Sequence, residues 1–161
     1  MREVINSILI RYNHDKFWKM YLDVQNNRCK GIRKNIYIAL LKRTMSMHCC
    51  DLMISRTKRE RFGAFFAGVP FLPHGLNGIV ISDRARIGKS CTILQQVTIG
   101  VRNLGEGAPI IGDNVFIGAG AKVLGEISVG NGAKIGANAV VLEDVPEGAT
   151  VVGNPGRIIR K

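Results

Sequence analysis

The chain has 161 residues, of which 23 are Lys or Arg and 12 are Asp or Glu, so its formal net charge is +11. With 46% hydrophobic and 22% charged residues, the composition is that of an ordered protein, and no apolar stretch is long enough to span a bilayer. The charge invites a nucleic-acid or membrane-surface interpretation. Neither a secretory signal nor a disulfide-framework spacing of the four cysteines is visible, so we expect a reducing, cytoplasmic location.

Charge and glycine are concentrated in different parts of the chain. Residues 1–70 contain 14 basic and 5 acidic residues, a net of +9, whereas residues 71–161 contain 9 and 7, a net of +2. Only one of the 19 glycines, Gly31, precedes residue 63. This shift predicts a helical N-terminal segment over residues 1–62 and a domain of different architecture over residues 63–161.

The N-terminal segment contains three runs of apolar residues at helical spacing. These are Ile5, Ile8, Leu9 and Tyr12, then Phe17, Trp18, Tyr21 and Leu22, then Ile32, Ile36, Ala39 and Leu40. Lys and Arg fall on the opposite faces. We interpret them as the solvated faces of helices that pack on each other or on a partner subunit, with membrane-surface contact as the alternative.

The second part repeats every six residues. Large aliphatic residues form one series, which consists of Ile81, Ile87, Ile93, Ile99, Ile111, Ile117, Val123, Val129, Ile135 and Val141. A smaller series lies two positions earlier, at Ala85, Cys91, Val97, Val115, Ala121, Ile127, Ala133 and Ala139. The residue after the large aliphatic is often glycine, as at Gly88, Gly100, Gly112, Gly118, Gly130 and Gly136, and Asn114, Asn131 and Asn138 lie in the same regions.

A strict period of six predicts a parallel β-helix, with a β-sandwich as the alternative. Residues two apart on a strand face the same way, so both apolar series are expected to point inward. Gly and Asn tolerate left-handed backbone conformations, which suits tight corners between short strands. Each coil would stack on the next around one continuous core.

The repeat resembles that of the hexapeptide acyltransferases. Within this family, the stretch from Gly78-Ile79-Val80-Ile81 through Leu94-Gln95-Gln96-Val97-Thr98-Ile99-Gly100 looks like serine acetyltransferase, as do residues 111–121 and 152–157. The resemblance covers residues 68–161. It implies a left-handed β-helix with a short helical N-terminal segment, a homotrimer, and acetyl-CoA bound between neighbouring β-helices.

Transfer of acetyl to a hydroxyl requires a base, for which histidine is suited near neutral pH. The chain offers His14, His48 and His74. Serine acetyltransferases carry their catalytic histidine just before the Gly-Ile-Val-Ile run, and His74 alone matches that position. Asn77 lies in the same segment, and the loop that begins after Gly100 carries Arg102, so both are candidates for contact with the acceptor.

The resemblance also suggests where acetyl-CoA would bind. Small residues that would let its pantetheine arm approach the backbone are Gly118, Ala119, Gly136 and Ala137, with Thr98 and Gly100 as further candidates for the oxyanion site. Arg157 is the candidate for the CoA phosphates.

The sequence departs from the serine enzymes at three points. Pro73 replaces the Asp that directly precedes the histidine, and His74 lies four residues before Gly78 where three are usual. Gly107-Ala108 replaces an Arg-His pair that helps to hold the amino-acid substrate. The resemblance favours L-serine as the acceptor, and these three departures leave a sugar or polysaccharide unit as the alternative.

Other functional classes are less well supported by the residues. The repeats contain no histidine after His74, so we expect no metal site, and Cys91 is interpreted as a core residue. No nucleic-acid-binding motif is visible. The resemblance implies a trimer rather than a hexamer, because serine acetyltransferases form hexamers through a much longer helical domain. A non-catalytic trimeric scaffold with basic helices is the remaining alternative.

Overall fold

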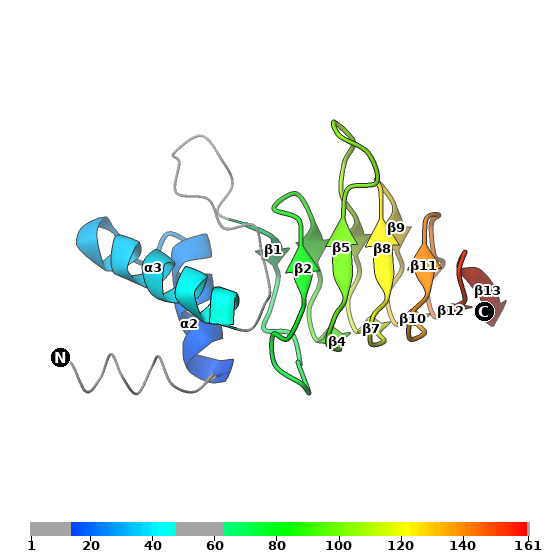
Figure 1. Cartoon of the computed structure of the whole chain (residues 1–161), viewed down its shortest axis with the longest axis horizontal. Helices are drawn as coiled ribbons and strands as arrows, with labels where there is room; N and C mark the ends of the chain where they lie inside the picture. The colour runs from blue at the N-terminus through cyan, green and yellow to red at the C-terminus, as the bar shows by residue number, and fades with distance from the viewer. Residues whose placement is uncertain (1–13, 48–62, 161) are drawn as a thin grey trace.

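A computed structural model describes residues 14–47 and 63–160 of the chain (Figure 1). Two helices, α2 (His14–Gln25) and α3 (Gly31–Met47), are followed by thirteen short strands. The expected helix over residues 5–12 lies outside the described residues, and so do His48 and the junction around residues 61–62. The strands are β1 (Phe65–Phe66), β2 (Val80–Ile81), β3 (Arg86–Ile87), β4 (Thr92–Ile93), β5 (Thr98–Gly100), β6 (Ile110–Ile111), β7 (Phe116–Ile117), β8 (Lys122–Leu124), β9 (Ser128–Val129), β10 (Lys134–Ile135), β11 (Val140–Val141), β12 (Thr150–Val152) and β13 (Arg157–Arg160).

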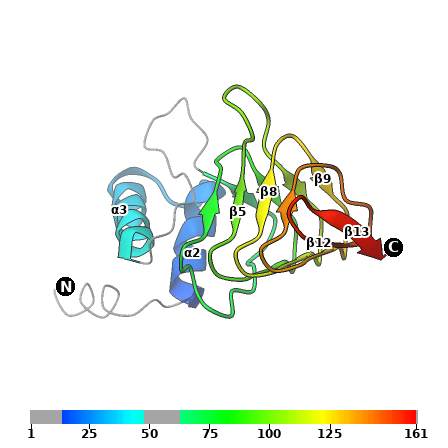
Figure 2. The same cartoon turned by 45° about the vertical axis from the view of Figure 1, so that its right-hand side comes forward.

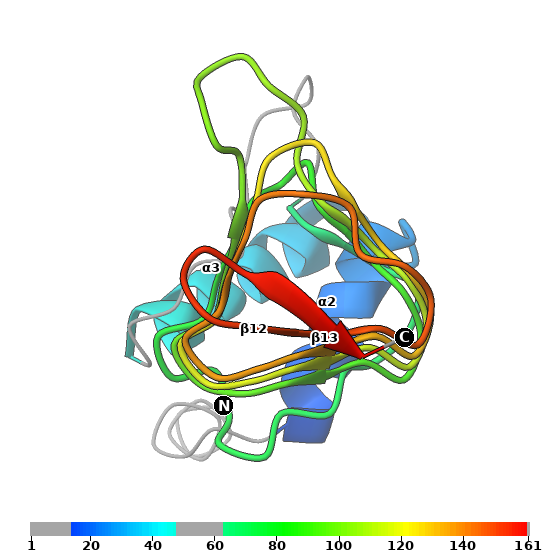
Figure 3. The same cartoon turned by 90° about the vertical axis from the view of Figure 1, so that its right-hand side faces the viewer.

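The strands form the three faces of a left-handed parallel β-helix. The first face contains β2, β5, β8 and β11, the second β1, β3, β6 and β9, and the third β4, β7, β10, β12 and β13. All pairings are parallel except that of β12 with β13, which turns back and ends the coil. Seen along its axis in Figure 3, the β-helix has a triangular outline from which one loop projects.

Both apolar series fill the core, as the period of six predicts. Every member of the large aliphatic series and of the smaller series is buried. On β2, for example, Val80 is 37% exposed whereas Ile81 is 1% exposed. The alternation arises because successive strand residues point to opposite faces.

The expected conformation of the corner glycines is wrong at six positions. None of the glycines directly after the large aliphatic residues has a positive φ, and the left-handed residues lie two positions further along, as at Asn114 (φ 57°) and Asn138 (φ 56°). Most of the six glycines are needed because the next coil is close. A Cβ on Gly118 would lie 2.6 Å from the backbone nitrogen of Ala137, although one on Gly100 would meet no atom within 4 Å.

Helix α2 closes the N-terminal end of the β-helix (Figures 1 and 2). The Trp18 ring lies 4.7 Å from the Phe66 ring of β1 in an edge-on arrangement, and the Tyr21 hydroxyl donates to the Ala64 carbonyl at 2.7 Å. All these aromatic side chains are buried. The cap removes the open end of the apolar core from water.

Helix α3 packs against α2 and lies further from the coils. Its buried residues include Ile38, Leu41 and Met45, which share one helical face. In the part of the chain that the structure describes, no helix is both long and apolar enough to cross a membrane.

Candidate functional site

His74 lies on a turn that connects the third face to the first. Phe71 still pairs with Thr92 of β4, and the chain then turns before entering β2. The side chains of Leu72 and Leu76, which are 7% and 0% exposed, hold the turn against the core. His74 itself is exposed. Within residues 14–47 and 63–160 its imidazole makes no hydrogen bond, so no described side chain takes the place of the missing Asp at position 73 in orienting it.

The same corner of the β-helix carries the small residues expected to contact acetyl-CoA. A ladder of backbone hydrogen bonds stacks its turns: Gln96 N donates to Asn77 O at 2.9 Å, Gly120 N to Gln95 O at 3.0 Å, and Asn138 N to Ala119 O at 2.8 Å. Asn77, Gln95, Ala119 and Ala137 therefore occupy equivalent positions in successive coils. We call this edge the His74 corner. His74 lies three residues before Asn77 in the first turn of this corner, and Gly118, Ala119, Gly136 and Ala137 lie in later turns of it.

Gln95 is a candidate that the sequence analysis missed. Its side-chain oxygen Oε1 is buried and has no hydrogen-bond partner among the described residues. A buried amide oxygen without a partner is unfavourable, so a hydrogen-bond donor from a bound substrate or a neighbouring chain would stabilise it. The sequence feature that points to Gln95 is its long polar side chain at a coil position that alanine occupies in the next two coils, as Ala119 and Ala137.

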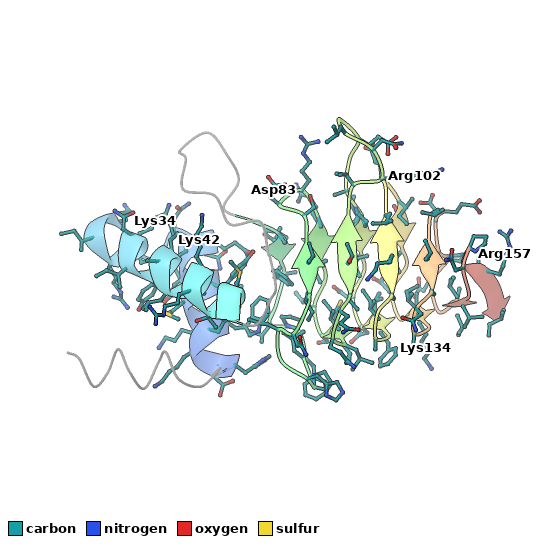
Figure 4. The ribbon with its side chains drawn as sticks, viewed as in Figure 1. Lys34, Lys42, Asp83, Arg102, Lys134 and Arg157 are labelled. Atoms are coloured by element: carbon teal, nitrogen blue, oxygen red, sulfur yellow. The ribbon has the colours of Figure 1, made fainter. Side chains whose placement is uncertain are left out.

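Arg102 lies at the opposite edge of the first face from His74. β5 runs from the His74 corner, through Thr98, to Gly100, and the loop of residues 101–109 follows at the far edge (Figures 3 and 4). The side chain of Arg102 is exposed, and Leu104 is 100% exposed. One chain therefore does not bring Arg102 and His74 together. Thr98 and Gly100 lie between them on the same face.

The projecting loop is braced by Glu106. Its carboxylate accepts hydrogen bonds from the backbone and side chain of Asn103, at 3.2 and 2.7 Å, and its carbonyl accepts one from Arg84 at 3.0 Å. At the base of the loop, a Cβ on Gly107 would lie 2.6 Å from the carboxyl carbon of Glu126. Ala108 is 8% exposed. A larger side chain at Gly107 would have to displace the exposed carboxylate of Glu126, whereas Ala108 is enclosed.

Arg157 begins β13, directly after the last turn of the His74 corner. That turn is held by hydrogen bonds from Val140 N to Gly153 O at 3.0 Å and from Gly156 N to Val140 O at 2.7 Å. The guanidinium is exposed at the C-terminal end of the β-helix (Figure 4). Arg157 also lines a small cavity that includes Glu143 and Asp144, so its surroundings contain negative as well as positive charge.

Cys91 occupies the small inward slot predicted for it. It is 0% exposed, and its thiol donates to the Gly112 carbonyl at 3.2 Å. Burial raises the pKa of this thiol. Among the described residues, no group of three or more His, Cys, Asp and Glu side chains is placed to hold a metal ion.

Comparison with known proteins supports the architecture derived above. Residues 108–143 match the family described as bacterial transferase hexapeptide (six repeats). The serine acetyltransferase of Bacillus licheniformis is 52% identical over 91 residues, which cover 55% of this chain and 42% of that protein. That of Bacillus subtilis is 50% identical over 91 residues, with the same coverage.

Solved structures extend the similarity to most of the chain. A serine acetyltransferase in complex with cysteine superposes with a TM-score of 0.72 and 32% identity, covering 96% of this chain and 57% of that one. One in complex with CoA gives 0.69 and 33%, covering 92% and 58%. The chain thus spans between 42% and 58% of the length of these relatives. Its sequence and its fold are similar to those of serine acetyltransferases, and residues 108–143 carry the hexapeptide repeat of bacterial transferases.

Proposed function

We propose that the protein is an O-acetyltransferase that uses acetyl-CoA and has L-serine as its acceptor. The carrying observation is the His74 corner, where an exposed imidazole stands at the head of a column of small residues that runs along the β-helix. The similarity to serine acetyltransferases, one of them solved with CoA and one from Neisseria gonorrhoeae with serine, supports both substrates. Residues 63–161 would carry this chemistry, with residues 1–62 as a separate helical segment.

In this proposal His74 acts as the general base. Acetyl-CoA would supply the thioester carbonyl that is attacked. His74 removes the proton of the acceptor hydroxyl while the hydroxyl oxygen forms its bond to the carbonyl carbon. The imidazolium then returns the proton to the sulfur as the carbon–sulfur bond breaks, so the products are the acetyl ester and a free thiol.

The remaining residues of the corner would bind and orient the substrates. The N–H groups of Thr98, Gly118 and Gly136 donate to neighbouring coils, so the N–H groups of Ala119 or Ala137 beside them would stabilise the negative charge on the carbonyl oxygen. Ala119 and Ala137 leave the backbone accessible to the pantetheine arm, and Arg157 lies where the corner ends. Gln95 would accept a hydrogen bond from the bound substrates through its unpartnered oxygen.

We further propose that the active unit is a homotrimer. His74 and Arg102 stand at opposite edges of the first face, so a site that uses both needs the His74 corner of one chain and the loop of its neighbour. Closed rings are the usual result of such a head-to-tail contact. Light scattering tests this assembly, and a monomer or a hexamer would contradict it.

A sugar hydroxyl is the second candidate acceptor. Gly107 and Ala108 offer no guanidinium for a carboxylate, and the carboxyl group of Glu126 lies against Gly107. This arrangement suits a neutral acceptor better than an amino acid. Arg102 is the chain's own alternative carboxylate ligand in this loop.

The release of free thiol from acetyl-CoA tests the proposal directly. Purified protein is assayed with L-serine, with a set of sugars and without acceptor, and wild type is compared with His74→Ala and the control His14→Ala. We expect serine-dependent release that falls by about 100-fold or more in His74→Ala and is unchanged in His14→Ala. Release with sugars alone would exclude serine, and no acceptor-dependent release would refute the enzyme proposal.

A further inference from the structure

Helix α3 is apolar on two opposite faces. Ile38, Leu41 and Met45 are buried on the face toward α2. On the outer face Ile32 is 79% exposed and Ile36 is 51% exposed. A helix on the surface of a globular protein normally presents polar residues outward, so the outer face of α3 is suited to contact with another apolar medium.

All the charged residues of the same helix are basic. Arg33, Lys34, Lys42 and Arg43 lie on it, and no Asp or Glu occurs from Val24 to Met47. Figure 4 shows Lys34 and Lys42 projecting from it. The guanidinium of Arg33 is held against Tyr37, with Nη2 donating to the hydroxyl at 2.9 Å, and remains exposed. At helical spacing Arg43 lies on the outer face with Ile32 and Ile36, Arg33 and Lys42 lie at its two flanks, and the half-buried Lys34 lies on the face toward α2.

Charge decides between the candidate occupants of this face. A second copy would bring the same cations against it, which is repulsive at short range. The segments of the chain that the structure does not describe are also basic: residues 1–13 contain two basic residues and one acidic, and residues 48–62 contain four and two. An anionic surface with an apolar layer beneath it is complementary in both respects.

We propose that the outer face of α3 docks on an anionic lipid bilayer. Ile32 and Ile36 enter the boundary between headgroups and acyl chains, while Arg43 beside them and Arg33 and Lys42 at the flanks contact lipid phosphates. α2 and α3 lie at the end of the β-helix opposite β13, so the coils extend away from the bound face (Figures 1 and 2). Association of several chains would strengthen the contact by presenting several such helices at once.

Flotation of the full-length protein with vesicles tests the proposal. Vesicles of phosphatidylcholine alone are compared with vesicles that contain about 30% phosphatidylglycerol. We expect binding only to the anionic vesicles, and a fall of about tenfold or more when salt is raised from 0.05 to ~0.5 M. Equal binding to both vesicles, or to neither, would overturn it.

Two variants separate insertion from simple attraction. We expect vesicle binding to fall about fivefold or more in each of two double variants of α3, Ile32→Ser/Ile36→Ser and Lys42→Gln/Arg43→Gln. Vesicle binding should not change in the control variant Lys134→Gln/Arg157→Gln, which removes two cations near the opposite end of the β-helix. Thermal melting checks that each variant is folded. Unchanged vesicle binding in the isoleucine variant would overturn the proposal, as would a smaller oligomer in that variant by light scattering, since the face would then join protein chains. The proposal would also be contradicted if the full-length protein bound a short DNA, but not the vesicles, through the cations of α3.

Discussion

The side-chain amide of Gln25 makes both backbone hydrogen bonds that Phe66 offers. Nε2 of Gln25 donates to the Phe66 carbonyl at 2.9 Å, and the Phe66 N–H donates to Oε1 at 3.0 Å. Phe66 belongs to β1, the edge strand of the second face. The last residue of α2 thus satisfies the backbone of the first strand as a neighbouring strand would, and it closes an edge at which other chains could pair.

Loss of this amide should destabilise the whole β-helix. We expect Gln25→Ala to lower the free energy of unfolding by about 1–3 kcal/mol, because a partly buried N–H and C=O lose their partners together. Urea denaturation measures the change. Asn26→Ala, at the next and exposed position, is the matched control and should change stability by less than about 0.5 kcal/mol. Equal effects of the two substitutions would refute the role of Gln25.

Two glycines that look alike in the sequence should differ sharply when replaced by alanine. Both Gly118 and Gly100 directly follow a large buried aliphatic residue. A Cβ on Gly118 would lie 2.6 Å from Ala137 N, whereas one on Gly100 would meet nothing within 4 Å. We expect Gly118→Ala to cost about 1–3 kcal/mol of stability and Gly100→Ala little or none. Thermal unfolding compares them, and similar melting temperatures would contradict the close approach of the coils.

Replacement of Gln95 should separate activity from stability. Gln95→Met keeps the length of the side chain but removes the buried oxygen that has no partner among the described residues. The unliganded protein should be as stable as wild type or more so, while kcat/KM for acetyl transfer falls about tenfold, since only the bound substrates use the oxygen. A loss of stability with unchanged kcat/KM would assign Gln95 a purely structural role.

The buried thiol of Cys91 should make stability depend on alkaline pH. Burial raises its pKa in the folded protein, whereas an unfolded cysteine titrates near pH ~8.5. The folded state therefore keeps its proton where the unfolded state loses one, and the free energy of unfolding falls as the pH rises above that value. Cys91→Ala should reduce the loss of stability between pH ~7.5 and ~9.5 by about 1 kcal/mol, measured by urea denaturation at both pH values. An identical loss in both proteins would contradict this.

Much of the fold is local and could be predicted. A β-helix coil contacts only its neighbours, so a repeat of six residues specifies strand, corner and core positions without long-range information. Ile81, Ile87 and the rest of both series are buried for this reason. The six glycines that follow the large aliphatic residues were located correctly, but the reason predicted for them was wrong. A positive φ and the close approach of another backbone both favour a residue without a Cβ, and the sequence alone does not distinguish the two causes.

The candidate site was predictable only where it follows the repeat. By itself, the sequence determined the coil, its buried side chains and the stacking of Gly118 on Gly136, since these depend on position within a six-residue period. His74 precedes the repeats and was singled out by the resemblance to serine acetyltransferases. The tertiary structure decided that Gln25 closes the first strand, that Gln95 has a buried unpartnered oxygen, and that Arg102 lies at the far edge from His74. Such relations depend on how the ends and loops pack against the coils, and contacts between residues far apart in the chain leave no periodic pattern in the sequence.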